Sequence, residues 1–90
     1  MSMSFIIACE NGNRKIAELL LQNKEVDVKY TDEKGRTALH YASEKGHEAI
    51  VKLLLNRSEI KVNEKNNLGN TALHWASEKG HESIVDLLLN

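Results

Sequence analysis

The sequence predicts an all-α solenoid in which one helix-turn-helix unit is used three times. Residues 35–56 read GRTALHYASEKGHEAIVKLLLN and residues 69–90 read GNTALHWASEKGHESIVDLLLN, so eighteen of twenty-two positions are identical when residue 35 is aligned with residue 69. The offset between these two copies is 34 residues, and the same offset aligns residues 8–21 with residues 42–55 as a diverged first copy. Only 4% of the chain is aromatic, and a core of Leu, Ile, Val and Ala favours packed helices over a β-sandwich.

The first helix of each copy is expected to end at a glycine, and in the second and third copies to begin after a threonine. Thr37 and Thr71 are suited to the N-cap position, because their hydroxyl oxygens can accept hydrogen bonds from free backbone N–H groups of the first turn. Gly12, Gly46 and Gly80 are expected to end these helices, because glycine adopts the left-handed conformation that a helix end often needs.

The second helix and the loop after it complete each unit. Ile50, Val51, Leu53 and Leu54 recur at helical spacing and predict a buried helix face. Residues 24–35 and 58–69 alternate briefly between apolar and polar side chains and then fill with turn formers, which predicts a β-hairpin-like finger. Helices this short are marginal in isolation, so neighbouring units must cover their apolar faces, as they do in a solenoid.

These motifs closely resemble the ankyrin-repeat family. Residues 37–42 (TALHYA), 46–47 (GH) and 50–55 (IVKLLL), with their third-copy equivalents, are similar to its T-P-L-H-x-A signature and following helix. The resemblance implies a single domain over residues 1–90, with units of roughly 1–34, 35–68 and 69–90, the last without its finger. Two departures are that Ala38 and Ala72 replace the usual proline, and that Asn23 or Asn56 must serve where the family has a left-handed glycine.

Several functional classes are excluded by composition. Twelve basic and thirteen acidic residues, spread along the chain, provide no basic field for a nucleic acid. No apolar run is long enough for a membrane span or a signal-peptide core. The single cysteine, Cys9, rules out a disulfide framework and a Cys-based zinc site. We expect an intracellular protein, cytoplasmic or nuclear, with no membrane and no nucleic acid among its partners.

The polar residues that could suggest chemistry have simpler explanations. His40/His47 and His74/His81 are each separated by a helix end and have no third ligand at a zinc spacing, so no metal site is expected. The family resemblance implies that His40 and His74 hydrogen-bond locally to the neighbouring threonine. Cys9 aligns with small packed residues of the later copies and lacks a nearby base. We therefore expect no enzyme activity and no cofactor.

The resemblance implies binding of a partner protein on a concave surface of fingers and first helices. Tyr41 and Trp75 are candidate hot spots, although both rings could instead pack between units, and both roles can coexist. The alternative function is a structural spacer, or an N-terminal fragment of a longer array, with no partner of its own. The candidate protein-binding residues are Glu33, Lys34, Arg36, Tyr41, Glu44, Lys45, Asn67, Leu68, Asn70, Trp75, Glu78 and Lys79.

Two remaining features concern the last unit and one loop residue. Terminal repeats normally present a polar outer face, whereas Ile84, Val85, Leu87 and Leu88 keep the internal apolar pattern. We therefore expect either a longer array or a face covered by another molecule, with self-association as one case. Asn63, after the second helix of the middle unit, resembles the ankyrin asparagines that a dioxygenase hydroxylates.

Overall fold

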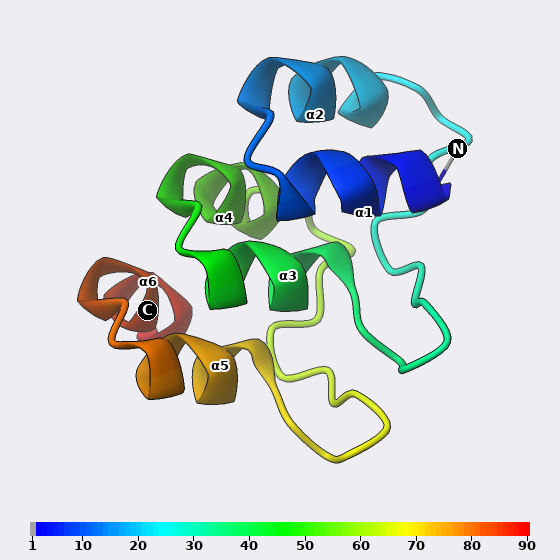
Figure 1. The fold of residues 1–90 in the computed structure, drawn as a ribbon. Helices are drawn as coiled ribbons and strands as arrows, with labels where there is room; N and C mark the ends of the chain where they lie inside the picture. The colour runs from blue at the N-terminus through cyan, green and yellow to red at the C-terminus, as the bar shows by residue number, and fades with distance from the viewer. Residues whose placement is uncertain (1) are drawn as a thin grey trace.

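The computed structural model describes residues 2–90 and folds them into six helices arranged as three consecutive pairs. Figure 1 shows the pairs stacked one upon another, with the first helix of each pair in one row and the second helix in another. This confirms the predicted all-α solenoid. The helices are α1 (Ser2–Glu10), α2 (Arg14–Leu21), α3 (Ala38–Lys45), α4 (Glu48–Leu55), α5 (Ala72–Lys79) and α6 (Glu82–Leu89).

The predicted helix caps are present. The Thr37 side-chain oxygen accepts a hydrogen bond from the backbone N–H of His40 at 3.3 Å, and Thr71 does the same for His74 at 3.3 Å. Gly46 and Gly80 end α3 and α5 with φ values of 79° and 75°. A Cβ atom at these positions would strain the left-handed backbone, which is why glycine stands there.

Two histidines join consecutive pairs, His47 beside Gly12 and His81 beside Gly46. His47 Nε2 lies 2.9 Å from the carbonyl oxygen of Glu10, and His81 Nε2 lies 3.0 Å from that of Glu44. A Cβ atom added to Gly46 would come within 2.8 Å of the His81 ring. The glycine therefore serves twice, because it ends its own helix and leaves room for a histidine of the next pair.

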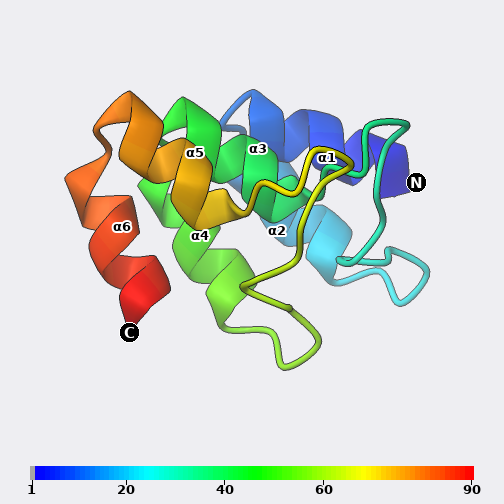
Figure 2. The same ribbon diagram turned by 90° about the horizontal axis from the view of Figure 1, so that it is seen from below.

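The two long loops leave the stack on the same side, as Figure 2 shows from below. No strand is assigned within residues 2–90. The hairpin-like reversal at each tip is closed by two backbone hydrogen bonds, which in the first finger run from the N–H of Asp32 to the carbonyl of Arg36 and from the N–H of Gly35 to the carbonyl of Asp32, both at 3.0 Å. The expectation that Asn23 or Asn56 adopts a left-handed backbone is wrong, since every positive φ in this part of the chain belongs to a glycine. Asn56 continues the right-handed turn of α4 with φ −76°, so no reversal is needed there.

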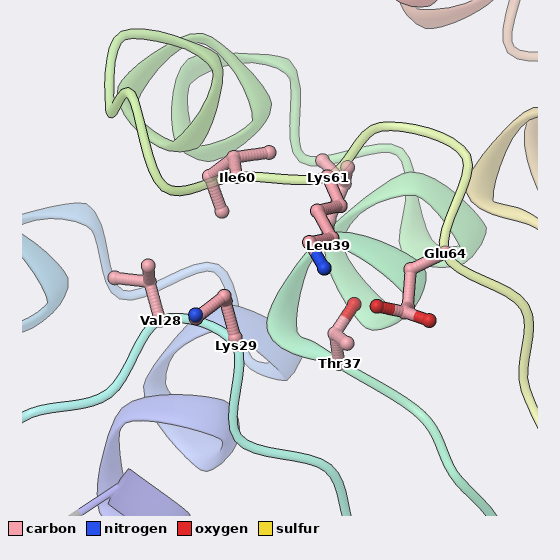
Figure 3. A pocket seen from close by; sticks show the side chains of 7 residues that line it. All are labelled: Val28, Lys29, Thr37, Leu39, Ile60, Lys61 and Glu64. Atoms are coloured by element: carbon pink, nitrogen blue, oxygen red, sulfur yellow. The ribbon is translucent and has the colours of Figure 1, made fainter.

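The core is aliphatic and runs through all three pairs. Its largest fully buried side chains include Phe5, Ile50 and Leu54, each at most 1% exposed. One small hollow lies beside it, where the two loops meet the start of α3 (Figure 3). Its volume of about 10 Å³ is close to the minimum that holds one water molecule, so it is no ligand cavity.

The last pair corrects one prediction about the C-terminal face. Ile84 is only 2% exposed and belongs to the core, so it does not contribute to an open apolar surface. Val85, Leu87 and Leu88 are half-buried, and Leu89 is 68% exposed. Ile84 is covered because its equivalent position on each helix points toward the preceding pair, which is present, and not toward the open end.

Candidate functional site

The finger tips are built by two side chains that sequence reasoning missed. Asp32 Oδ1 accepts hydrogen bonds from the backbone N–H groups of Lys34 and Arg36, both at 2.9 Å. Asn66, which takes the place of Asp32 one repeat later, accepts from Leu68 at 2.9 Å and from Asn70 at 3.0 Å. An Asp or Asn three residues before a glycine is a sequence signal for such a turn, and both fingers carry it.

The two fingers are also bonded to each other. The backbone N–H of Asn67 donates to the carbonyl of Lys34 at 2.9 Å, and its side-chain amide donates to the carbonyl of Glu33 at 2.9 Å. Gly35 makes this approach possible, because a Cβ atom there would collide with the Asn67 side chain. The tips are therefore fixed relative to one another as well as internally.

Arg36 fastens the first finger to two helices, in an arrangement we call the Arg36 clamp (Arg36, Tyr41, Glu44 and Trp75). Its guanidinium carbon lies 5.4 Å from the ring centre of Tyr41 and 5.1 Å from that of Trp75, within cation–π range. Arg36 Nη1 lies 3.8 Å from Glu44 Oε1, and both side chains are about one-fifth exposed. Tyr41 and Trp75 thus pack between consecutive pairs, which is the structural role that the sequence left open for them.

Hydrogen bonds lower the pKa of Asp32, which lies beside the Arg36 clamp. The Tyr41 hydroxyl donates to Asp32 Oδ2. Partial burial alone would raise the pKa of Asp32, but the bonds from Tyr41 and from two backbone N–H groups, with the charge of Arg36, leave it below its ordinary value. Burial first, and then the bond to Asp32, raises the pKa of Tyr41. The carboxylate of Asp32 therefore stays charged and the phenol of Tyr41 stays neutral at neutral pH. Because neither group changes its charge near neutral pH, we assign the cluster a structural role.

The twelve candidate binding residues divide into two groups. Six make contacts that hold the fingers and helices together: Arg36, Tyr41, Glu44, Asn67, Asn70 and Trp75. Asn70 does so through its backbone carbonyl, which lies 3.1 Å from the His40 ring. The other six have exposed side chains: Glu33, Lys34, Lys45, Leu68, Glu78 and Lys79. Asn63 is also exposed, in the second loop. Half of the candidate residues thus also hold the fingers and helices together.

His40 and His74 differ, although the sequence predicted the same local role for both. His40 Nδ1 accepts from the backbone N–H of Thr37 at 3.0 Å, and its Nε2 lies 3.1 Å from the carbonyl of Asn70. His74 instead has an exposed side chain 3.8 Å from Glu78 and packs edge-on against Trp75. The prediction is confirmed for His40 and wrong for the His74 side chain, because residues 71–90 contain no finger whose carbonyl could take the place that Asn70 has beside His40.

Two shallow hollows adjoin the finger tips. One, of about 430 Å³, lies between the first finger, α1 and α3, with Tyr30, Asp32, Lys34 and Tyr41 among its lining residues. The other, of about 310 Å³, lies between the two tips and is lined by Lys34, Arg36, Asn66, Asn67 and Leu68. Lys34 borders both hollows, so it lies between them.

Three features bear on metal binding, on cysteine reactivity and on membrane insertion. Within residues 2–90, no three His, Cys, Asp or Glu side chains gather as metal ligands would. Burial raises the pKa of the Cys9 thiol to about 12, so it stays protonated and is a poor nucleophile. None of the helices α1 to α6 combines the length and the apolar character that crossing a bilayer requires. What remains is a rigid surface with exposed tips.

Comparison with protein-family models explains this architecture. The model for ankyrin repeats matches residues 5–90 in three copies, which is nearly the whole chain. This chain belongs to the ankyrin-repeat family. Ankyrin repeats are in general protein-interaction modules without enzyme activity. A search of curated proteins finds no match to the chain.

Proposed function

We propose that this ankyrin domain binds a partner protein through its concave side, on a finger surface formed by Glu33, Lys34 and Leu68 and flanked by exposed first-helix residues. One observation carries the proposal: both tips are held by side-chain turns and bonded to each other, while these three side chains stay exposed beside two adjoining hollows. The flanking residues are Lys45, Glu78 and Lys79.

The rigidity of the tips favours binding. A surface whose backbone is already ordered loses less conformational entropy when a partner docks. Hydrogen bonds accepted by Asp32 and Asn66, together with one donated by Asn67, order the tip backbone before any partner arrives. The Arg36 clamp holds the same finger against α3 and α5, so Tyr41 and Trp75 contribute as supports rather than as free anchors.

The exposed side chains define the chemistry of the partner. Leu68 is 82% exposed at the second tip, where burial against an apolar surface would stabilise a complex. Lys34 and Glu33 at the first tip offer one charge of each sign. The partner suited to this surface therefore presents an apolar group beside a carboxylate for Lys34 and a basic group for Glu33. We further propose that the module acts inside the cell, because its single buried thiol is typical of a compartment that keeps cysteines reduced.

Selection from a displayed random-peptide library tests the proposal and requires no named partner. Peptides selected on the 90-residue chain are measured again on Lys34→Glu and Leu68→Glu. Each variant is expected to weaken binding at least about tenfold, as the loss of one hot-spot contact does. Lys24→Glu, which makes the same charge change on an exposed residue outside the finger surface, serves as the matched control and keeps full affinity.

Two results would overturn the proposal. Peptides that bind Lys34→Glu and Leu68→Glu as tightly as the original chain would move the site away from the finger surface. Failure to select any binder would instead favour the structural-spacer function.

A further inference from the structure

The two ends of the stack expose helix positions that are buried between the pairs. Ile50 and Ile84 are 1% and 2% exposed, whereas Ile16, at the same position of α2, is 50% exposed. Ile7 and Leu19 are likewise 47% and 66% exposed, while their equivalents in the later pairs are half-buried. In Figure 1 this surface lies on the α1 and α2 side of the stack. We call it the start face: Ser4, Ile7, Ile16 and Leu19.

The opposite end exposes the complementary set. Ser77 is exposed, although Cys9 and Ser43 at the same position are fully buried. Val85 is half-buried, while its equivalent Val51 is fully buried. Gly80 has nothing within 4 Å of its added Cβ, whereas Gly12 and Gly46 are each touched by a histidine of the next pair. We call this surface the end face: Ser77, Gly80, Val85 and Leu89.

The start and end faces are therefore the two halves of one interface. Between the pairs of this chain, the helices that carry these positions contact each other twice, α1 with α3 and α2 with α4, and then α3 with α5 and α4 with α6. Both open faces keep the apolar character of that internal interface. A second copy placed by the same step as the one that relates consecutive pairs would bring its start face onto the end face of the first copy.

Charge complementarity supports the same register. α6 carries the carboxylates of Glu82 and Asp86 and has no basic residue in its last turn. α2 opens with Arg14 and Lys15 and has no acidic residue in its first turn, where the helix dipole disfavours cations. Even with Glu18 paired to Arg14 at 3.8 Å, these three residues leave a net positive charge on α2.

The internal hollow between α2 and α4 shows which of these charges would meet. Arg14 lines that hollow together with Glu48, Ala49 and Lys52 of the next pair. At a junction between two copies, Glu82 of the first copy takes the place of Arg14, because it lies two repeats later in the sequence. Arg14 and Lys15 of the second copy take the places of Glu48 and Ala49, because they lie one repeat earlier. The counterpart of Lys52 is Glu18, so Glu82 of one copy would meet two cations and one carboxylate of the next, which together carry a net charge opposite to its own.

We propose that this chain self-associates head to tail, with the end face of one copy seated on the start face of a second copy in continuation of its own stack. The two faces differ, so the contact is heterologous, and each added copy presents a fresh end face. Growth is therefore open-ended and does not stop at a dimer. The finger surface is not part of this junction, and the proposal does not depend on the proposed function.

Sedimentation velocity on the 90-residue chain provides the test. Across low-micromolar to near-millimolar concentrations, the average mass is expected to rise above the 10.1 kDa of one chain without levelling at twice that value. Two variants block one face each. Ile16→Glu places a charge in the start face, and the helix dipole favours an acidic residue in the first turn of α2. Ser77→Lys places a long side chain in the end face, and the helix dipole favours a basic residue in the last turn of α5. Circular dichroism checks that both stay folded.

Mixing the two variants is the decisive measurement. Each variant alone is expected to remain a monomer, since it keeps only one competent face. An equimolar mixture is expected to form a one-to-one dimer that cannot grow, because the intact end face of Ile16→Glu meets the intact start face of Ser77→Lys. Leu68→Glu, which removes an exposed leucine from the finger surface, is the control and should associate like the original chain.

Several outcomes would overturn the proposal. A chain that stays at 10.1 kDa throughout has no such interface. Association that survives both variants uses another surface. Association that only Ser77→Lys abolishes pairs two end faces with each other, and association that only Leu68→Glu abolishes belongs to the finger surface.

Discussion

Arg36 holds together parts of the chain that are distant in sequence. The residue lies in the first finger, its ion-pair partner lies at the end of α3, and one of its two aromatic contacts lies in α5. Most of its side chain is withdrawn from solvent, which strengthens cation–π contacts relative to exposed ones. The residue therefore contributes to folding stability more than an ordinary surface arginine does.

Replacing Arg36 tests that contribution. Arg36→Ala is expected to lower the free energy of unfolding by about 1–2 kcal/mol, since it removes two cation–π contacts and leaves Glu44 without its partner. Urea denaturation followed by circular dichroism measures the change. The matched control is Arg14→Ala, whose ion pair with Glu18 is largely exposed and is expected to contribute less than about 0.5 kcal/mol. Equal losses in the two variants would mean that the clamp adds no stability.

His40 links stability to pH. Its Nδ1 must be unprotonated to accept the bond from Thr37, and burial holds its pKa below the ordinary value. As pH falls from about 6.5 toward the folded-state pKa, the unfolded chain takes up a proton that folded His40 does not, so stability is lost in that window. Unfolding free energies measured between neutral pH and about pH 5 are expected to show this decline.

Removal of the ring distinguishes His40 from the other histidines. His40→Ala is expected to be less stable at neutral pH by on the order of 2 kcal/mol, since it leaves buried hydrogen-bonding groups unpaired, and to lose its share of the pH slope. His74→Ala, which changes the exposed residue at the same position, should keep the slope. If both variants retained it, the pH dependence would come from elsewhere.

At the scale of the elements, helix ends are defined by local and by tertiary requirements together. Gly46 and Gly80 end α3 and α5 in nearly the same left-handed conformation. Of these two glycines, only Gly46 also lies against a histidine of the next pair. The two glycines therefore separate the backbone requirement from the packing requirement.

Alanine at each glycine measures the two parts. Gly80→Ala is expected to lower the free energy of unfolding by about 1–2 kcal/mol through left-handed strain alone. Gly46→Ala should cost on the order of 1 kcal/mol more, because the new methyl group displaces His81 and weakens its bond to Glu44. Chemical denaturation of both variants gives the difference directly. Identical losses would show that the histidine moves aside without penalty.

At the scale of the whole molecule, stability is distributed unevenly along the stack. Only the middle pair is covered on both sides, and its Val51 and Leu54 are fully buried while the equivalent Val85 and Leu88 of the last pair are not. In a solenoid, stability is approximately a sum of unit terms and nearest-neighbour terms. The middle pair has two neighbours and each outer pair has one.

Native-state hydrogen exchange should reveal this gradient. Amides of α3 and α4 are expected to exchange slowest, and those of α6 faster by at least about tenfold, which corresponds to about 1.4 kcal/mol in opening free energy. Measurement at low protein concentration keeps any head-to-tail association from protecting α6. Uniform protection across the six helices would indicate that the stack opens only as a single unit.

The sequence by itself determined the repeat, the helix pairs and their ends. These depend on rules that act within a few residues or on a visible period: Thr37 caps the helix that follows it, Gly46 ends that helix, and the leucines of α4 return at helical spacing. Such features need no information about neighbours, so the fold class and the aliphatic core followed from the sequence directly.

Tertiary structure alone decided which polar and aromatic residues are free. Arg36 reaches Trp75, Asn67 reaches Glu33, and His47 reaches Glu10, each across roughly one repeat length. Nothing in the local sequence of these residues indicates such contacts, and identical motifs diverge where the neighbour differs, as His74 shows. Even Ile84, which the pattern placed on an open face, is buried, because which side of a helix is covered depends on the pair that stands beside it.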